Sequence, residues 1–274
     1  MIFVIGSTSR LAKALMAQYQ EKDEICAVSR DVYASWAKEG GDVLVYAFLK
    51  ERASKSDKIF VTAGVLDPRV QYEQVAKINV TLVEHILKAA WMLELEVISF
   101  GTVMEKQFET PNNYIRTKEI LADHVSDYFN RGLAVSHFQL HTLYGEGEPS
   151  SFMFLGQLLQ ALRNETLFEM TRGDQKREYH HVQDDAEAIR LLLKSGCRGV
   201  MAVSHGDSYS LAEIAKHLFT SMNKEHLLRV GRLPDLSEEC YECRLEKTPQ
   251  LESFEFRDTL PALTDFVVSL CQSN

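Results

Sequence analysis

Tyr114 and Lys118 are the residues of this sequence whose types and spacing best fit acid–base chemistry. They stand four positions apart within residues 113–129, a segment whose pattern predicts a helix, so their side chains would share one helical face. A lysine ammonium beside a tyrosine hydroxyl favours the phenolate form and lowers the pKa of the tyrosine. The pair therefore predicts a tyrosine that exchanges a proton at neutral pH.

The segments before this pair alternate between strand and helix patterns. Ile2–Ile5 is a short apolar run, residues 6–9 form a turn, and residues 10–16 have helical periodicity. Further strands are expected at residues 24–28, 58–62, 96–100, 134–141 and 199–203, with helices between them at residues 75–91, 113–129 and 184–193. This alternation predicts an α/β fold, a Rossmann-like doubly wound parallel sheet.

The pattern loosens after residue 145, which predicts a second, smaller part of the chain. We expect residues 1–145 to form a dinucleotide-binding domain, to which residues 178–205 return. Residues 146–274 would then be mostly a carboxy-terminal substrate-binding lobe. Within it, Ser210 and Glu213 have the spacing of a helix capping box.

Ligands of such sheets bind at the carboxyl ends of the strands, where the first turn and helix present backbone N–H groups to a pyrophosphate. Ser9 and Ala12 occupy the second and third positions of the glycine fingerprint that begins at Gly6. Together with Tyr114 and Lys118, this turn points to redox chemistry on a nicotinamide cofactor. The residues expected to bind the cofactor at this turn are Gly6, Ser7, Thr8, Ser9, Arg10 and Leu11.

The second strand is followed by Ser29 and Arg30, which offer a hydroxyl and a planar guanidinium to a 2′-phosphate. NADP(H) is therefore favoured over NAD(H), although Asp31 follows and suits a ribose 2′-hydroxyl. At the end of the third strand, three small residues would let the cofactor approach the backbone. They are Thr62, Ala63 and Gly64.

The composition is that of an ordinary globular protein, with 274 residues and a formal net charge of -9. An acidic chain without a long apolar run predicts no nucleic-acid partner and no membrane association. Five cysteines without framework spacing favour a cytoplasmic location. Cys240 and Cys243 form a C-x-x-C pair, but no second ligand pair has matching spacing, so no metal centre is predicted.

Seven sequence landmarks lie in an order typical of one known family, over residues 1 to 215. They are Gly6-x-x-Ser9-x-x-Ala12, Thr62-Ala63-Gly64, Ile78-Asn79-Val80, Ser99-Phe-Gly-Thr102, Tyr114-x-x-x-Lys118, Leu143-Tyr144-Gly145 and Arg177-Glu-Tyr-His-His-Val-Gln-Asp184. The chain resembles the extended short-chain dehydrogenase/reductase family, and within it the nucleotide-sugar epimerases, dehydratases and reductases. The Gly101-Thr102 pair with its short following loop is similar to small CDP-sugar reductases such as the paratose and abequose synthases.

The resemblance implies roles for individual residues. Tyr114 would be the catalytic acid/base, and Lys118 would orient the nicotinamide ribose and lower the pKa of the tyrosine. Either Ser99 or Thr102 would hydrogen-bond the reacting oxygen, and Thr102 is favoured. The resemblance further implies Asn79 as a cofactor contact, Arg177 as a ligand of the substrate diphosphate, and His141 as a residue near the nucleotide base.

The same resemblance limits which reactions of the family are expected. Dehydratases of the family carry an Asp-Glu pair after the catalytic threonine, whereas Val103 and Met104 follow here. We expect an NADPH-dependent reductase of a 4-keto nucleotide-linked deoxysugar. An NAD-dependent 4-epimerase and a nucleotide-sensing regulatory protein without turnover are the alternatives. Apolar faces on residues 75–91 and 113–129 would pair across a homodimer, as in relatives.

Overall fold

The computed structural model describes residues 1–19, 24–235 and 245–272. The chain folds into two compact units. Unit 1 consists of Met1–Leu140 and Ala186–Val203, and unit 2 of His141–Asp185 and Ser204–Asn274. Each unit has its own apolar core.

Unit 1 is built on a six-stranded parallel sheet with the order β10-β5-β4-β3-β1-β2. Its strands are β1 (Ile2–Ile5), β2 (Ile25–Val28), β3 (Lys58–Val61), β4 (Glu96–Thr102), β5 (Val135–Leu140) and β10 (Gly199–Ala202). The central strands are buried on both faces, which explains their continuous apolar sequences. Since every pairing is parallel, all six carboxyl ends lie at one edge of the sheet. The predicted doubly wound α/β fold is confirmed.

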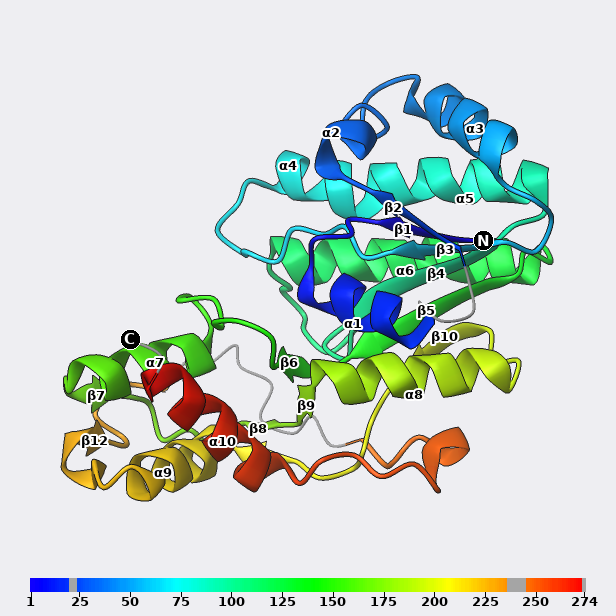
Figure 1. Ribbon diagram of the computed structural model, residues 1–274. Helices are drawn as coiled ribbons and strands as arrows, with labels where there is room; N and C mark the ends of the chain where they lie inside the picture. Colours follow the sequence, from blue (N-terminus) through cyan, green and yellow to red (C-terminus); the bar gives the residue numbers. More distant parts are fainter. Residues whose placement is uncertain (20–23, 236–244, 273–274) are drawn as a thin grey trace. The chain divides into compact units, whose positions relative to one another are not determined.

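Helices cover both faces of this sheet, with α3, α5 and α6 on one side and α1 with the unit 1 part of α8 on the other (Figure 1). The helices of unit 1 are α1 (Arg10–Tyr19), α2 (Arg30–Tyr33), α3 (Gly41–Arg52), α4 (Tyr72–Ala76), α5 (Leu82–Leu93), α6 (Asn113–Asn130) and, from Ala186 onward, α8 (Val182–Lys194). The face beneath α3, α5 and α6 forms a continuous core that includes Phe3, Ile59, Ile86 and Val125.

The helix predicted over residues 75–91 differs in one respect from the structure. Between α4 and α5 lies a π-helical turn, η1 (Lys77–Thr81). Asn79 is in the middle of this turn, and its side chain is fully buried. It forms hydrogen bonds with Val65 and Thr117, which lie outside the turn. Hydrophobic periodicity predicts a helix here but carries no signal for a widened turn of this kind, which often accompanies a functional site.

Unit 2 has short strands and three longer helices around a separate core. Its strands are β6 (Thr142–Tyr144), β7 (Phe168–Glu169), β8 (Lys176–Arg177), β9 (Tyr179–His181), β11 (Tyr209–Ser210) and β12 (Leu228–Arg229). They form two-stranded sheets in the pairs β6–β9, β11–β8 and β12–β7. The helices are α7 (Phe154–Asn164), the start of α8, α9 (Leu211–Ser221), α10 (Thr259–Gln272) and the 3-10 turns η2 (Glu225–Leu227) and η3 (Pro249–Leu251). The predicted capping box of Ser210 and Glu213 begins α9.

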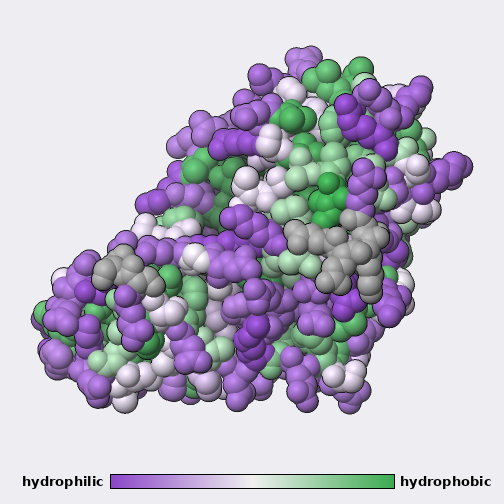
Figure 2. Space-filling view, in the orientation of Figure 1, coloured by the Kyte–Doolittle hydropathy of each residue, from purple (hydrophilic) through white to green (hydrophobic). Residues whose placement is uncertain are grey.

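The face seen in Figure 2 is mainly hydrophilic, with apolar side chains gathered in smaller patches. None of the helices in the described residues combines the length and apolar character needed to cross a membrane. Cys240 and Cys243 lie outside the described residues.

Candidate active site

The turn after β1 is closely packed and requires glycine. Gly6 has a φ of +90°, and a Cβ there would lie 2.6 Å from the backbone nitrogen of Ala63. The Ser9 hydroxyl then accepts a hydrogen bond from the Ala12 N–H at 3.1 Å, which caps the start of α1. Glycine and serine thus bring the chain from the strand into a helix within four residues.

Several backbone N–H groups at the start of α1 lack an acceptor among the described residues. Within the described part of the chain, the N–H groups of Ser7, Thr8, Arg10 and Leu11 have no hydrogen-bond acceptor. These donors and the partial positive charge of the helix amino terminus favour a bound anion. The turn therefore fits the pyrophosphate of a dinucleotide.

The end of β2 lies beside this turn, because the Gly6 N–H donates to the Val28 carbonyl at 3.1 Å. Ser29 precedes the short helix α2, and Arg30 is its first residue. Both side chains are exposed, and Arg30 forms no ion pair with any described residue. The guanidinium is therefore available to an anionic group.

The end of β3 joins the turn to the middle of the sheet. The Thr62 hydroxyl donates to the Ile5 carbonyl at 2.9 Å, and the Ala63 N–H donates to the same carbonyl at 2.8 Å. Gly64 follows, and a Cβ there would lie 3.6 Å from Asn79 Oδ1 and 3.9 Å from Lys118 Nζ. The structure thus brings Gly64, Asn79 and Lys118 together.

Asn79 links the loop after β3 to α6. Its Oδ1 accepts from the Val65 N–H at 2.8 Å, and its Nδ2 donates to the Val65 carbonyl at 3.0 Å and the Thr117 hydroxyl at 3.1 Å. All of its side-chain polar atoms therefore have protein partners. In this geometry Asn79 positions the backbone around the site.

Tyr114 and Lys118 lie in the first two turns of α6, which the Asn112 side chain caps. Lys118 is 8% exposed, and its Nζ donates to the Phe100 carbonyl at 2.7 Å. Burial lowers the pKa of Lys118 to about 8, and the nearby Glu105 carboxylate partly opposes this shift. The Tyr114 hydroxyl makes no hydrogen bond to the described residues.

Burial and the charge of Glu105 raise the pKa of Tyr114 above its ordinary value. The pKa of Tyr114 is thus raised, whereas Lys118 was predicted to lower it; the Lys118 ammonium donates to the Phe100 carbonyl. The phenol stays protonated at neutral pH. The raised pKa also makes this phenol a weaker acid than an ordinary tyrosine.

Thr102 ends β4 and is held by a residue that sequence reasoning missed. The Thr102 N–H donates to Glu105 Oε1 at 2.7 Å, and its hydroxyl accepts from the Met104 N–H at 3.3 Å. Glu105 Oε2 accepts from the Gln139 amide at 2.7 Å, and Oε1 lies 3.3 Å from His137 Nε2. The only sequence signal for Glu105 is its place three residues after the threonine, in a turn.

Ser99, the other hydroxyl considered for the site, is fully buried within β4. Its Oγ lies 2.8 Å from His137 Nδ1, and Ser99 and His137 are register partners on adjacent strands. Gly101 leaves room for this network, because a Cβ there would lie 2.0 Å from Glu105 Oε1 and 2.2 Å from His137 Nε2. Ser99 thus supports the strand, whereas Thr102 stands at its end.

The two residues predicted to bind substrate both lie in unit 2. Arg177 is in β8, and its Nη1 donates to the Lys176 carbonyl at 2.7 Å. His141 directly precedes β6 and is buried beside Glu178. The positive charge of Arg177 contributes to lowering the pKa of His141, after burial and His180. The charge of Arg177 is thus close enough to His141 to affect its pKa.

Comparison with known proteins agrees with this architecture. The model of the NAD dependent epimerase/dehydratase family matches residues 2–204. The chain belongs to this epimerase/dehydratase family. Membership of the epimerase/dehydratase family confirms the predicted resemblance and the prediction of an NAD(P)-dependent enzyme of the oxidoreductase type.

Solved structures of nucleotide-sugar enzymes share the epimerase/dehydratase fold. A dTDP-4-dehydrorhamnose reductase from Clostridium acetobutylicum is similar at a TM-score of 0.77 and 15% identity, covering 98% of this chain and 99% of that chain. A UDP-glucose 4-epimerase from Thermus thermophilus, in complex with NAD, has a TM-score of 0.80 and 14% identity over 100% and 99% of the two chains. A Bacillus anthracis dTDP-4-dehydrorhamnose reductase in complex with NADP has a TM-score of 0.77 and 16% identity over 98% and 97%. No curated protein matches the chain in sequence.

Proposed function

We propose that the protein is an NADPH-dependent reductase of a 4-keto nucleotide-linked deoxysugar, with Tyr114 as the proton donor. The observation that carries this proposal is the Tyr114 hydroxyl at the start of α6, which makes no hydrogen bond to the described residues and can therefore donate to a substrate. The family assignment supports the same substrate class.

The residues around the turn after β1 would hold the cofactor. Backbone N–H groups of the turn and α1 would bind the pyrophosphate, and Arg30 with Ser29 would bind a 2′-phosphate. When bound, NADPH supplies the hydride that reduces the ketone carbon. Lys118 would contact the nicotinamide ribose from its buried place beside Gly64.

Thr102 would orient the reacting oxygen. Its backbone is fixed by Glu105, so its position at the strand end is rigid before any substrate binds. Tyr114 would then transfer its proton to that oxygen, which becomes the product hydroxyl. In unit 2, Arg177 would bind the substrate diphosphate through its planar guanidinium.

A 4-epimerase that retains NAD is a second candidate, which Asp31 supports. This carboxylate directly follows Arg30 in the first turn of α2 and suits the 2′-hydroxyl of NAD. The epimerase from Thermus thermophilus has the same fold with NAD bound, and the Bacillus anthracis reductase has it with NADP.

We also propose a homodimer that uses the outer faces of α5 and α6. Trp91, Met92 and Phe129 are exposed at the ends of these helices. Exposed apolar groups of this size are suited to a protein interface. Light scattering after gel filtration tests this proposal, and a monomer of the Met92→Lys variant beside a wild-type dimer would support it.

Titration of the purified protein with NADPH and with NADH, followed by nicotinamide fluorescence and melting temperature, separates the functions. Stronger binding of NADPH, followed by its oxidation with a 4-keto nucleotide sugar, supports the reductase. Tight or co-purified NAD(H) supports the epimerase instead. Cofactor that binds without any turnover supports a regulatory protein, and binding of neither cofactor would contradict the assignment of the β1 turn.

A further inference from the structure

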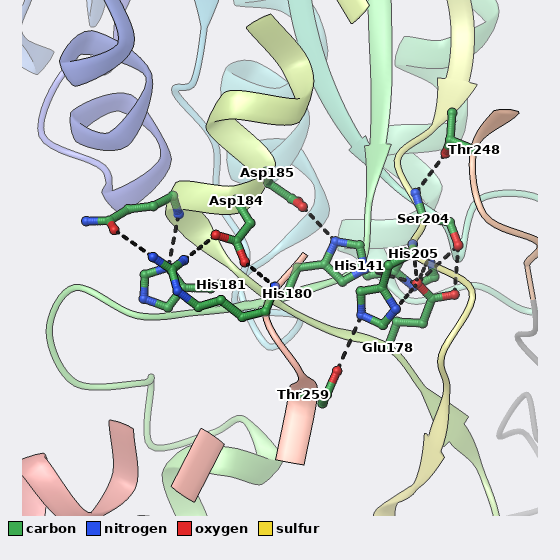
Figure 3. A network of polar contacts seen from close by, with 12 residues as sticks. His141, Glu178, His180, His181, Asp184, Asp185, Ser204, His205, Thr248 and Thr259 are labelled. Carbon is green, nitrogen blue, oxygen red and sulfur yellow. Dashed lines mark hydrogen bonds and ion pairs between the residues drawn. The ribbon is translucent and has the colours of Figure 1, made fainter. Parts of the chain in front are cut away.

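A buried group of imidazole and carboxyl side chains lies within unit 2. Its members are His141, Glu178, His180, Asp185 and His205, and their side chains converge in Figure 3. His180 is stacked between the other two histidines, with ring centroids 4.9 Å from His141 and 4.3 Å from His205. The roles proposed above for Tyr114, Lys118 and Arg177 make no use of this group.

Three of these side chains each bring one potential ligand atom into the same small region. Glu178 Oε2 lies 3.0 Å from His180 Nε2 and 3.6 Å from His141 Nε2. All three atoms lie within 4.8 Å of one another. Ligands of tetrahedral zinc, at about 2.0 to 2.1 Å from the metal, stand about 3.3 Å apart. The two separations from Glu178 Oε2, 3.0 Å and 3.6 Å, are close to this spacing.

His141 gives an independent sign that a ligand belongs there. Its side chain is 2% exposed, and Nε2 has no hydrogen-bond partner among the described residues. A buried ring nitrogen without a hydrogen-bond partner is costly unless a ligand binds to it.

The surrounding hydrogen bonds orient the other two side chains. His180 Nδ1 lies 2.6 Å from Asp185 Oδ1, which is the carboxylate–histidine arrangement that commonly fixes a metal-binding imidazole. Glu178 Oε1 accepts from the Ser204 hydroxyl at 2.8 Å, and Oε2 accepts from the His205 N–H at 3.0 Å. These contacts from Ser204 and His205 hold the Glu178 carboxylate in place.

We propose that His141 Nε2, Glu178 Oε2 and His180 Nε2 bind one divalent transition-metal ion, with zinc the ion that fits best. Two imidazoles and one carboxylate are a common zinc ligand set, and imidazole nitrogen disfavours calcium and magnesium. On binding, the proton that His180 Nε2 shares with Glu178 leaves to solvent, and a metal–nitrogen bond takes its place. His205 is left out of the ligand set, because its Nδ1 accepts from the Asp207 N–H at 3.0 Å and its Nε2 lies 3.4 Å from Thr259 Oγ1.

The charge of a divalent ion would balance the buried carboxylates of this group. Glu178 and Asp185 are both fully buried, and they flank the same histidine. Two positive charges on the metal would balance two carboxylates without a protonated imidazole. The ion would also join the residue before β6 to β9, so its main effect would be to stabilise unit 2.

Zinc titration of the full-length protein after removal of metals with a chelator tests the proposal. We expect one zinc ion per chain by calorimetry and a higher melting temperature with zinc but not with magnesium. The His141→Gln variant should bind zinc at least about 100-fold more weakly, and Asp185→Asn about 10- to 100-fold more weakly. His226→Gln, which changes an exposed histidine of the same unit, should bind as the wild type does.

X-ray absorption on the zinc-loaded wild type provides a test that needs no variant. The expected first shell has nitrogen and oxygen at about 2.0 to 2.2 Å with imidazole scattering beyond it. Sulfur at about 2.3 Å would place the ion on cysteines and would overturn the proposal. Absence of stoichiometric binding, or a well-folded His141→Gln variant that binds zinc normally, would overturn it as well.

Discussion

The backbone N–H of Thr102 donates a hydrogen bond to Glu105 Oε1 at 2.7 Å. A fully buried carboxylate three residues downstream thus sets the end of the strand at the threonine proposed to hold the reacting oxygen. Burial and this carboxylate both raise the pKa of Tyr114, whereas burial lowers the pKa of Lys118 and the carboxylate opposes that shift in part. Glu105 therefore acts on the site through other residues, as a positioning residue.

Replacement of Glu105 by alanine should destabilise unit 1. The Thr102 N–H and the Gln139 amide would lose their acceptor inside the protein, at a cost of about 2 to 4 kcal/mol in the free energy of unfolding. Urea unfolding measures this loss. Glu109→Ala, which removes an exposed carboxylate from the same loop, should change the stability by less than about 0.5 kcal/mol. Equal stability of the two variants would contradict the role given to Glu105.

Removal of the Tyr114 hydroxyl should stop the reaction without affecting the cofactor site. Loss of a positioned proton donor lowers turnover by about 100- to 10,000-fold. Tyr114→Phe should bind NADPH within about threefold of the wild type, because the binding energy comes mainly from contacts to the phosphates. Tyr46→Phe, on α3, is the matched control. Unchanged turnover in Tyr114→Phe would refute the assignment of the proton donor.

Arg30 should decide between the two nicotinamide cofactors. A charge-assisted hydrogen bond to a phosphate is worth about 1.5 to 3 kcal/mol, so Arg30→Ala should weaken NADPH binding about ten- to a hundred-fold. Binding of NADH should change little, since it lacks the 2′-phosphate. Lys38→Ala removes another exposed cation nearby in the sequence and should leave both affinities unchanged. A parallel loss of both affinities in Arg30→Ala would instead point to a general role in binding.

The lowered pKa of Lys118 makes stability depend on pH in a defined direction. Its pKa is about 8 in the folded protein, against an ordinary value of 10.5, so between these values the unfolded chain binds more protons. The free energy of unfolding must therefore rise with pH in this window. From about pH 7.5 to about pH 9.5, the wild type should gain about 1 to 2 kcal/mol relative to Lys118→Met. A flat difference between the two unfolding curves would show that Lys118 is not perturbed.

Local sequence patterns predicted the parallel sheet of unit 1, because each strand is a short apolar run and each intervening helix has its own periodicity. The places of Gly6, Arg30, Tyr114 and Lys118 at the carboxyl edge follow from the same reasoning, since parallel strands end together. The π-helical turn around Asn79 could not be predicted, because the hydrogen bonds of its side chain reach residues 65 and 117.

Contacts between residues far apart in the sequence could not be predicted either. Glu105 meets His137 and Gln139 across the sheet, and His141 meets residues 178 and 180 only because β6 pairs with β9. Their spacing in the sequence resembles no metal-binding motif, so the sequence does not indicate the proposed site. The pKa of Tyr114 depended on burial and on Glu105, and neither can be read from a Tyr-x-x-x-Lys spacing.

Gly101 restricts how this sequence can change over evolution. A Cβ at this position would overlap the Glu105 carboxylate and the His137 imidazole, so no other residue fits while both are present. The three positions should therefore covary among homologues as a set. In a newly sequenced relative, any residue other than glycine at position 101 would indicate that Glu105 or His137 has also been replaced.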